Sequence, residues 1–308
     1  MSHFTVTVCL NNPDDLETAL APFDENKKAE PYRSYETDSP ADFWAVDLLR
    51  EEAGLNPDDA TLTWAQVAEA HNTHWPDPVN DAVPMHVDES GRAYTMSTYN
   101  EKSKWDWYQI GGRWTGRFPY KQEHENLVIM GERSWMSADD VVMPLHCDGG
   151  QKLALSLNVM RDEAGAEAVK TYARYEAAVA GTPEALPWST FADNVSEGNG
   201  CTIERAREEY GSQPRIAALR KNRDFGIWAD NEDYACGRKL FIERARARAV
   251  PGYAVLTADG RWLTPGDMGW FGMSRATEGS RIGYWEIANA YIEALPDDAW
   301  LVSVDCHI

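Results

Sequence analysis

The sequence predicts an α+β fold, in which a mixed or antiparallel sheet carries large helical insertions. The chain opens with an alternating apolar strand at Phe4–Leu10 and closes with the apolar strand Trp300–Cys306. The order is strand–helix at the start and hairpin–helix–strand at the end, as in ferredoxin-like units. We therefore expect a sheet that is closed by the N- and C-terminal strands. A ferredoxin-like core is one form that this sheet could take. Helical patterns between them predict an insertion at about 158–250 within a single domain that spans residues 1–308.

Helix signals recur along the chain. A Ser, Thr, Asn or Asp before an apolar stripe of helical period predicts a start, and Gly or Pro predicts an end. Residues 21–40 are polar and contain prolines, which favours a loop. The helices expected from these signals cover residues 13–20, 40–53, 64–70, 158–180, 202–210, 214–221, 231–250 and 284–295.

Strand signals are short runs of β-branched and aromatic residues with a period of two. The turn Ala258-Asp259-Gly260 lies between two such runs, which is typical of a hairpin. The strands expected from this pattern cover residues 4–10, 92–98, 105–110, 113–118, 126–130, 253–257, 261–263 and 300–306.

The densest local pattern is the segment Lys104–Trp114, which reads KWDWYQIGGRW. Its first half predicts a strand, and the paired glycines Gly111 and Gly112 predict a tight turn into a second strand. One interpretation is a core hairpin whose indoles are simply buried. The other is a ligand site, because the Arg113 fork pairs with anions and stacks on aromatic rings, and a glycine turn offers N–H groups to an anion.

Composition limits the classes of function. The chain has 308 residues, 43% hydrophobic residues and a formal net charge of −21, so it is expected to fold and not to bind nucleic acid directly. Residues 1–100 hold 19 Asp/Glu against 5 Lys/Arg, whereas residues 201–250 hold 11 Lys/Arg against 8 Asp/Glu. This asymmetry is compatible with a host protein partner, or with an ordinary solvated surface.

Cysteine usage and hydropathy indicate a compartment. The five cysteines include no Cys-x-x-Cys pair, which suits a reducing cytoplasm. The chain start lacks a basic segment followed by an apolar one, so no signal peptide is expected. No apolar run approaches the roughly 20 residues of a membrane helix, so no membrane partner is expected.

Several motifs resemble a family of bacteriophage proteins with no characterised activity. They are MSHFTV (Met1–Val6), LAPFDE (Leu20–Glu25), KWDWYQIGGRWTG (Lys104–Gly116), MRDEAG (Met160–Gly165), GDMGWFGM (Gly266–Met273) and LVSVDCHI (Leu301–Ile308). The resemblance implies phage origin and a location in the host-cell cytoplasm. It implies no catalytic residue and no cofactor.

The C-terminal strand is the second place where chemistry is expected. Asp305 and His307 alternate onto one face, and such a pair can do acid–base work. Both are candidate catalytic residues, although polar residues at a strand end also serve structure alone. With Arg113 and Trp270 they would form a polar pocket with aromatic walls. The ligand-binding candidates are Trp105, Trp107, Tyr108, Gly111, Gly112, Arg113, Trp114 and Trp270.

Three functional hypotheses follow. The first is a phage protein that binds, or binds and processes, a small planar or anionic ligand such as a nucleotide, in counter-defence or host takeover. The second is an acidic inhibitor of a host enzyme or a nucleic-acid mimic. The third is a metal-dependent hydrolase that uses His71, His74, His86 or the Asp305/His307 pair, although the sequence has no metalloprotease, Walker or hydrolase motif and the histidine spacing alone predicts no metal site.

Overall fold

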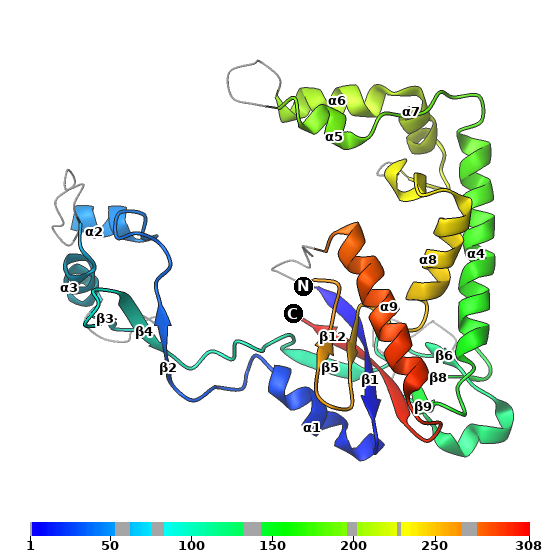
Figure 1. The fold of residues 1–308 in the computed structure, drawn as a ribbon, viewed down its shortest axis with the longest axis horizontal. Coiled ribbons are helices and arrows are strands. Elements are labelled where there is room, and N and C mark those ends of the chain that lie inside the picture. The colour runs from blue at the N-terminus through cyan, green and yellow to red at the C-terminus, as the bar shows by residue number, and fades with distance from the viewer. Residues whose placement is uncertain are drawn as a thin grey trace. The chain divides into compact units, whose positions relative to one another are not determined.

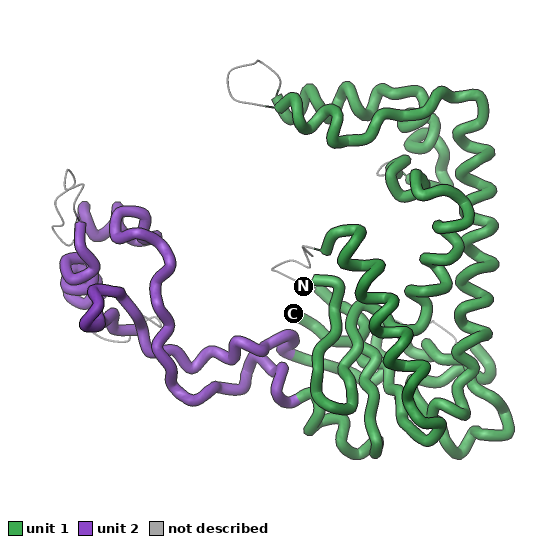
Figure 2. The backbone as a smooth tube through the Cα atoms, viewed as in Figure 1, with its two compact units in different colours: residues 1–20, 107–308 green, residues 21–106 purple. Residues whose placement is uncertain are grey.

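The computed structural model describes residues 2–52, 62–75, 83–131, 143–195, 202–226, 229–266 and 276–308. The chain forms two compact units (Figure 2), where the sequence analysis expected a single domain. Unit 1 consists of residues 1–20 and 107–308, and unit 2 consists of residues 21–106. The division follows from packing, because residues 21–106 contain their own hydrophobic core.

Unit 1 is built on a mixed sheet that confirms the α+β prediction (Figure 1). Its order over the described residues is β11-β10-β1-β12-β9-β7, with β5 also paired to β12. The terminal strands β1 and β12 pair antiparallel along their whole length, as expected, while β10 runs parallel to β1. The strands are β1 (His3–Leu10), β5 (Trp107–Ile110), β7 (Val128–Ile129), β9 (Gly149–Gln151), β10 (Ala254–Leu256), β11 (Trp262–Leu263) and β12 (Trp300–His307).

The strand order shares only part of a ferredoxin-like arrangement. In such a unit the second strand of the hairpin lies beside the first strand of the chain. Here the neighbour of β1 is β10, the first strand of the hairpin formed with β11. The pairing of terminal strands is therefore common to both, and the position of the hairpin is not.

The predicted hairpin over residues 105–118 is wrong. β5 pairs with β12 and not with the segment that follows it, and β6 (Phe118–Pro119) pairs with β8 (His146–Cys147) in a separate two-stranded sheet. The cause lies at the turn, where the Gly111 N–H donates to the carbonyl of Ser303 on β12. Two further turn hydrogen bonds, from Trp114 to Gly111 and from Thr115 to Gly112, then carry the chain away from β5.

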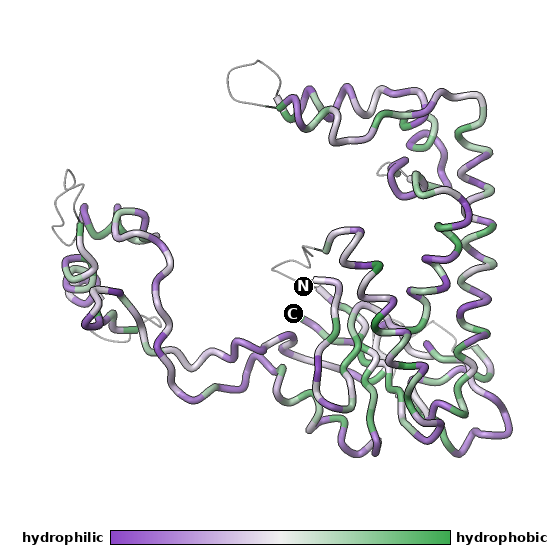
Figure 3. The backbone as a smooth tube through the Cα atoms, viewed as in Figure 1, coloured by the Kyte–Doolittle hydropathy of each residue, from purple (hydrophilic) through white to green (hydrophobic). Residues whose placement is uncertain are grey.

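Helix α9 (Glu278–Ala294) packs on this sheet and forms the main core of unit 1. It begins with a capping box at Thr277, whose side chain accepts from the Ser280 N–H. Its helical stripe buries Tyr284, Ala288 and Ile292 against apolar residues of the strands. Figure 3 shows the hydrophobic stretches along these strands.

Apart from α1 (Leu16–Leu20), the remaining α-helices that the structure describes in unit 1 lie between β9 and β10, where the sequence predicted a helical insertion. The long helix α4 packs against α8, and its C-terminal part joins a smaller core that contains Tyr172, Tyr175, Val179 and Leu219. Short 3-10 helices lie at Pro13–Asp15, Gln122–Leu127 and Glu232–Tyr234. The α-helices are α1 (Leu16–Leu20), α4 (Leu157–Ala178), α5 (Trp188–Ala192), α6 (Ile203–Ser212), α7 (Pro214–Lys221) and α8 (Arg238–Arg248).

Unit 2 combines a three-stranded antiparallel sheet, in the order β2-β4-β3, with two helices. A strand lies at 32–35, within the segment expected to be a loop, because it pairs with the edge of β4. A 3-10 helix lies at Ala21–Phe23. The main elements are β2 (Tyr32–Tyr35), α2 (Val46–Glu52), α3 (Trp64–His74), β3 (Met85–Val87) and β4 (Ala93–Ser97).

Among the described residues of both units, no helix has the length and apolar character that crossing a membrane requires.

Candidate functional site

The end of the sheet in unit 1 brings several predicted site residues together. The register of β5 and β12 places Trp107 opposite His307 and Gln109 opposite Asp305. The pairing of β1 with β12 adds His3, which lies opposite His307. Trp107 is 49% exposed, and its ring meets the His3 ring edge-on with centroids 6.3 Å apart.

Asp305 is held by two partners inside the protein. It is 1% exposed; His3 Nδ1 lies 2.8 Å from its Oδ1, and the Arg113 backbone N–H donates to its Oδ2 at 3.0 Å. The His3 and His307 rings meet edge-on with centroids 5.0 Å apart. Sequence reasoning missed His3 because 302 residues separate it from Asp305, and only the pairing of the first and last strands signals the contact.

The glycine turn lies directly against two carboxylates of the protein, those of Asp148 and Asp305. Gly111 and Gly112 have φ of +72° and +54°, and a Cβ on them would lie 2.5 Å from Asp148 and 2.4 Å from Asp305 respectively. Asp148 is buried and accepts hydrogen bonds from the N–H groups of Gly116 at 2.6 Å and Gly131 at 2.7 Å. These contacts explain why the turn requires glycine. The N–H groups of Gly111 and Gly112, which the sequence analysis assigned to an outside anion, already donate to the backbone carbonyls of Ser303 and Ile110.

The other predicted ligand residues are dispersed. Trp105 belongs to unit 2, where it is 6% exposed. Tyr108 and Trp114 are half-buried in unit 1, and the Arg113 side chain is exposed. Burial raises the pKa of Tyr108, and the nearby Glu17 and Cys306 raise it further. Trp270 lies outside the described residues.

The three histidines of the hydrolase hypothesis lie in unit 2 among aromatic rings. His71 is buried near Trp75, with ring centroids 4.8 Å apart, and burial lowers its pKa. His74 also meets Trp75, and His86 on β3 lies over Tyr94. In the described part of the chain, no three His, Cys, Asp or Glu side chains are arranged to hold a metal ion.

A pocket of about 520 Å³ in unit 1 gathers arginines and aromatic rings that lie far apart in the sequence. It lies between β6, α4, α8 and α9. Among its described lining residues there is no Asp or Glu, although the chain as a whole is strongly acidic. We call it the arginine pocket, and its defining residues are Arg117, Arg248, Arg281, Tyr253, Tyr284 and Trp285.

Arg117 is the central cation of the arginine pocket. It directly precedes β6, and its Nη2 donates to the carbonyls of Ala249 at 3.0 Å and Val250 at 3.2 Å, just after the end of α8. Its Nε is buried and has no hydrogen-bond partner among the described residues. Burial lowers the pKa of Arg117 to about 10, so the guanidinium is still charged at neutral pH. A buried donor on a charged group is costly unless an acceptor reaches it.

Two further cations, Arg248 and Arg281, line the arginine pocket. Arg248 is the last residue of α8 and Arg281 lies in the first turns of α9; neither forms an ion pair within the described part of the chain. Both lie near Asp233, whose pKa is nevertheless raised, because burial and the neighbouring acids Asp230 and Glu232 outweigh these arginines. Two other arginines of α8 do form ion pairs: Arg246 pairs with Asp162, and Arg244 pairs with Glu278.

Aromatic side chains also line the arginine pocket. The Tyr284 hydroxyl donates to the carbonyls of Pro251 and Gly252, and the Tyr253 hydroxyl donates to the carbonyl of Gly266 at 3.1 Å. Burial raises the pKa of Tyr284 well above its usual range, so this hydroxyl stays protonated. Fixed rings beside guanidinium groups can stack a planar ligand and pair its negative group at the same time.

The sequence held only a partial signal for this pocket. The sequence shows several arginines in the segment that forms α8, but this pattern is also typical of an ordinary solvent-exposed charged helix. Arg117 lies 131 positions before Arg248, and only tertiary contacts bring them together.

No protein-family model matches the chain, and neither the curated proteins nor the solved structures contain a match. The resemblance to phage proteins therefore stays a prediction.

Proposed function

We propose that the protein binds a small planar anion, such as a nucleotide, in the arginine pocket. The observation that carries this proposal is the buried, unpaired Nε of Arg117 in a pocket whose described lining includes no acid. Removing a charge from water costs several kcal/mol unless a partner of opposite charge compensates. An anionic oxygen within reach of Arg117 would supply this partner.

The other residues of the pocket indicate the shape of the ligand. Arg248 and Arg281 offer forks that suit phosphate or carboxylate oxygens. Trp285, Tyr253 and Tyr284 offer ring surfaces for a flat heterocycle. The resemblance to phage proteins supports a setting in the host-cell cytoplasm, with counter-defence or host takeover as the biological role.

Isothermal titration calorimetry with a panel of ligands tests the proposal. The panel contains inorganic phosphate, ribose 5-phosphate, mononucleotides, cyclic nucleotides and uncharged nucleosides. We expect a nucleotide to bind more tightly than either phosphate or nucleoside alone, because only the nucleotide engages both the arginines and the rings. Absence of binding across the panel would contradict the proposal.

Matched variants locate the binding. Arg248→Ala and Arg281→Ala each remove an exposed cation from the pocket, and each should weaken binding by about tenfold, the lower end for a hydrogen bond to a charged group. Arg246→Ala is the control, because it lies on the same helix and pairs with Asp162 outside the pocket. Arg117→Lys keeps the charge but loses the fork, and circular dichroism shows whether it folds. If Arg246→Ala weakens binding as much as Arg248→Ala, the ligand site is elsewhere.

A further inference from the structure

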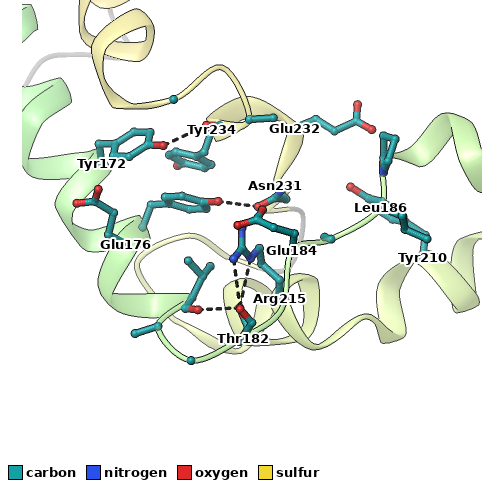
Figure 4. Close-up of a pocket in the computed structure, with 18 residues that line it drawn as sticks. Tyr172, Glu176, Thr182, Glu184, Leu186, Tyr210, Arg215, Asn231, Glu232 and Tyr234 are labelled. Carbon is teal, nitrogen blue, oxygen red and sulfur yellow. Dashed lines mark hydrogen bonds and ion pairs between the residues drawn. The ribbon is translucent and has the colours of Figure 1, made fainter.

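A second pocket of about 610 Å³ lies in the helical part of unit 1 (Figure 4). It is lined by the C-terminal end of α4, the segment after it, α6, α7 and residues 231–237. Four tyrosines line it, namely Tyr172, Tyr175, Tyr210 and Tyr234. We call it the tyrosine pocket, and none of its described lining residues is shared with the arginine pocket.

The tyrosine rings are fixed against one another. Tyr175 and Tyr234 stack with centroids 4.2 Å apart and planes 6° apart, and Tyr172 meets Tyr175 at 5.3 Å. Figure 4 shows Tyr172 and Tyr234 on one side and Tyr210 on the other. A rigid aromatic wall loses little entropy when a ligand binds to it.

The hydroxyl groups of three tyrosines already donate their protons within the protein. Tyr172 donates to the carbonyl of Tyr234 at 3.3 Å, Tyr175 donates to Asn231 Oδ1 at 2.7 Å, and Tyr210 donates to the carboxylate of Asp230. A hydroxyl whose proton is committed can only accept a further hydrogen bond. The hydroxyl oxygens of these three tyrosines therefore offer acceptors to a ligand and no donors.

The charged side chains at the pocket also favour a ligand that donates hydrogen bonds and carries a positive charge. Glu176, Glu184 and Glu232 line it, against a single arginine among its described lining residues, Arg215. Arg215 is already committed, since its guanidinium pairs with Glu184 and donates to Thr182. Glu176 in turn pairs with Arg238 at 2.9 Å, which leaves Glu232 as the carboxylate of the described lining without an ion pair. The lining thus keeps a negative charge and several acceptors, the opposite of the arginine pocket.

The Asn231 side chain supplies a donor to the pocket. Asn231 is 8% exposed, and its Oδ1 is taken by the Tyr175 hydroxyl. No hydrogen bond of its side-chain nitrogen occurs among the described residues. This amide lines the pocket and can donate to one acceptor on the ligand.

We infer that the tyrosine pocket binds a small organic cation, with an ammonium or guanidinium group and one hydrogen-bond acceptor. The glutamates and aromatic rings attract the cation, and the tyrosine oxygens accept its N–H groups. The Asn231 amide pairs with the acceptor. The same chemistry is present in a free amine, in free arginine derivatives, and in an Arg or Lys side chain of a peptide.

Calorimetry with two ligands of the same shape tests the charge requirement. n-Butylguanidinium and n-butylurea differ by one positive charge, and we expect the guanidinium to bind at least tenfold more tightly. Spermidine and L-argininamide represent free cations, and the peptide Gly-Arg-Gly amide represents a side chain. The tightest of these three identifies the source. Equal binding of n-butylurea, or no binding of any cation at millimolar concentration, overturns the inference.

Variants place the site. Glu232→Gln keeps an acceptor for the Trp188 N–H, at 2.6 Å from Glu232 Oε1, and removes only the charge. We expect a two- to fivefold loss of n-butylguanidinium affinity, as for an exposed ion pair worth about 0.5–1 kcal/mol, and a larger loss when Glu176→Gln is added. Glu243→Gln on α8 is the control, because it is outside the described lining. Equal losses in Glu232→Gln and Glu243→Gln would contradict this placement. Nucleotide binding should be unchanged in Glu232→Gln, which separates this inference from the proposed function.

Discussion

Replacing Asp148 by Asn should destabilise unit 1 strongly, even though the two side chains have almost the same shape. Asp148 is 2% exposed, and its two oxygens accept from two different backbone N–H groups, those of Gly116 and Gly131. The Thr115 hydroxyl adds a third contact at 3.2 Å. An Asn side chain has one acceptor oxygen, so one N–H group would face an amide nitrogen instead.

The magnitude follows from these contacts. A hydrogen bond to a charged group contributes about 1.5–3 kcal/mol, and a buried donor left without an acceptor costs about 1–3 kcal/mol. The free energy of unfolding should therefore fall by about 3–5 kcal/mol. This is a large part of the roughly 5–15 kcal/mol that stabilises a typical domain.

Urea denaturation of both proteins measures the loss, and hydrogen exchange by mass spectrometry locates it. We expect a lower denaturation midpoint, and faster exchange in peptides that contain Gly116 and Gly131. Asp162→Asn on α4 is the control, because its exposed pair with Arg246 should contribute less than about 1 kcal/mol. If Asp148→Asn unfolds at the same urea concentration as the unmodified protein, the assignment of Asp148 as a structural anchor is refuted.

Two further predictions concern titratable side chains. Burial lowers the pKa of His71 below its ordinary value of 6.5, so the folded state binds fewer protons than the unfolded state; the stability of unit 2 should be full above pH 6.5 and fall as the pH drops through the folded-state pKa. Hydrogen exchange of α3 at pH 7 and pH 5 measures this, and a response unchanged in His71→Gln would show that other groups cause it. Burial raises the pKa of the thiols of Cys9 and Cys147 to about 12 and raises that of Cys306 further, so iodoacetamide should modify Cys236 first among the described cysteines. Peptide mapping after brief alkylation checks the order, and early labelling of Cys9 or Cys306 would contradict the buried strand positions.

The helices were predicted from local signals, and most of them formed where those signals lie. Thr202 caps α6 and Pro214 begins α7, as expected. Strand pairing was harder, because a strand signal gives no partner. The segment after Gly112 was expected to return along β5. Instead, the Gly111 N–H donates to the Ser303 carbonyl on β12, and the chain leaves β5 at this turn.

The predicted site residues show the same limit. Trp107 and His307 do meet, because β5 lies beside β12, but Asp305 is occupied by His3 and by the Arg113 N–H group. The sequence analysis predicted a site for planar anions around Arg113, whereas the pocket that we propose for this role is lined by Arg117, Arg248 and Arg281. These three come from separate parts of the chain, and no spacing relates them.

By itself, the sequence determined the α+β class, the pairing of the chain's two ends and the position of the helical insertion, because apolar periodicity and capping residues act over a few positions. Only the tertiary structure decided that residues 21–106 form a unit of their own, and that arginines gather in one pocket and tyrosines with glutamates in another. Charge and hydrogen-bond complementarity in a pocket depend on distances between residues far apart in the chain, and no local pattern encodes those distances.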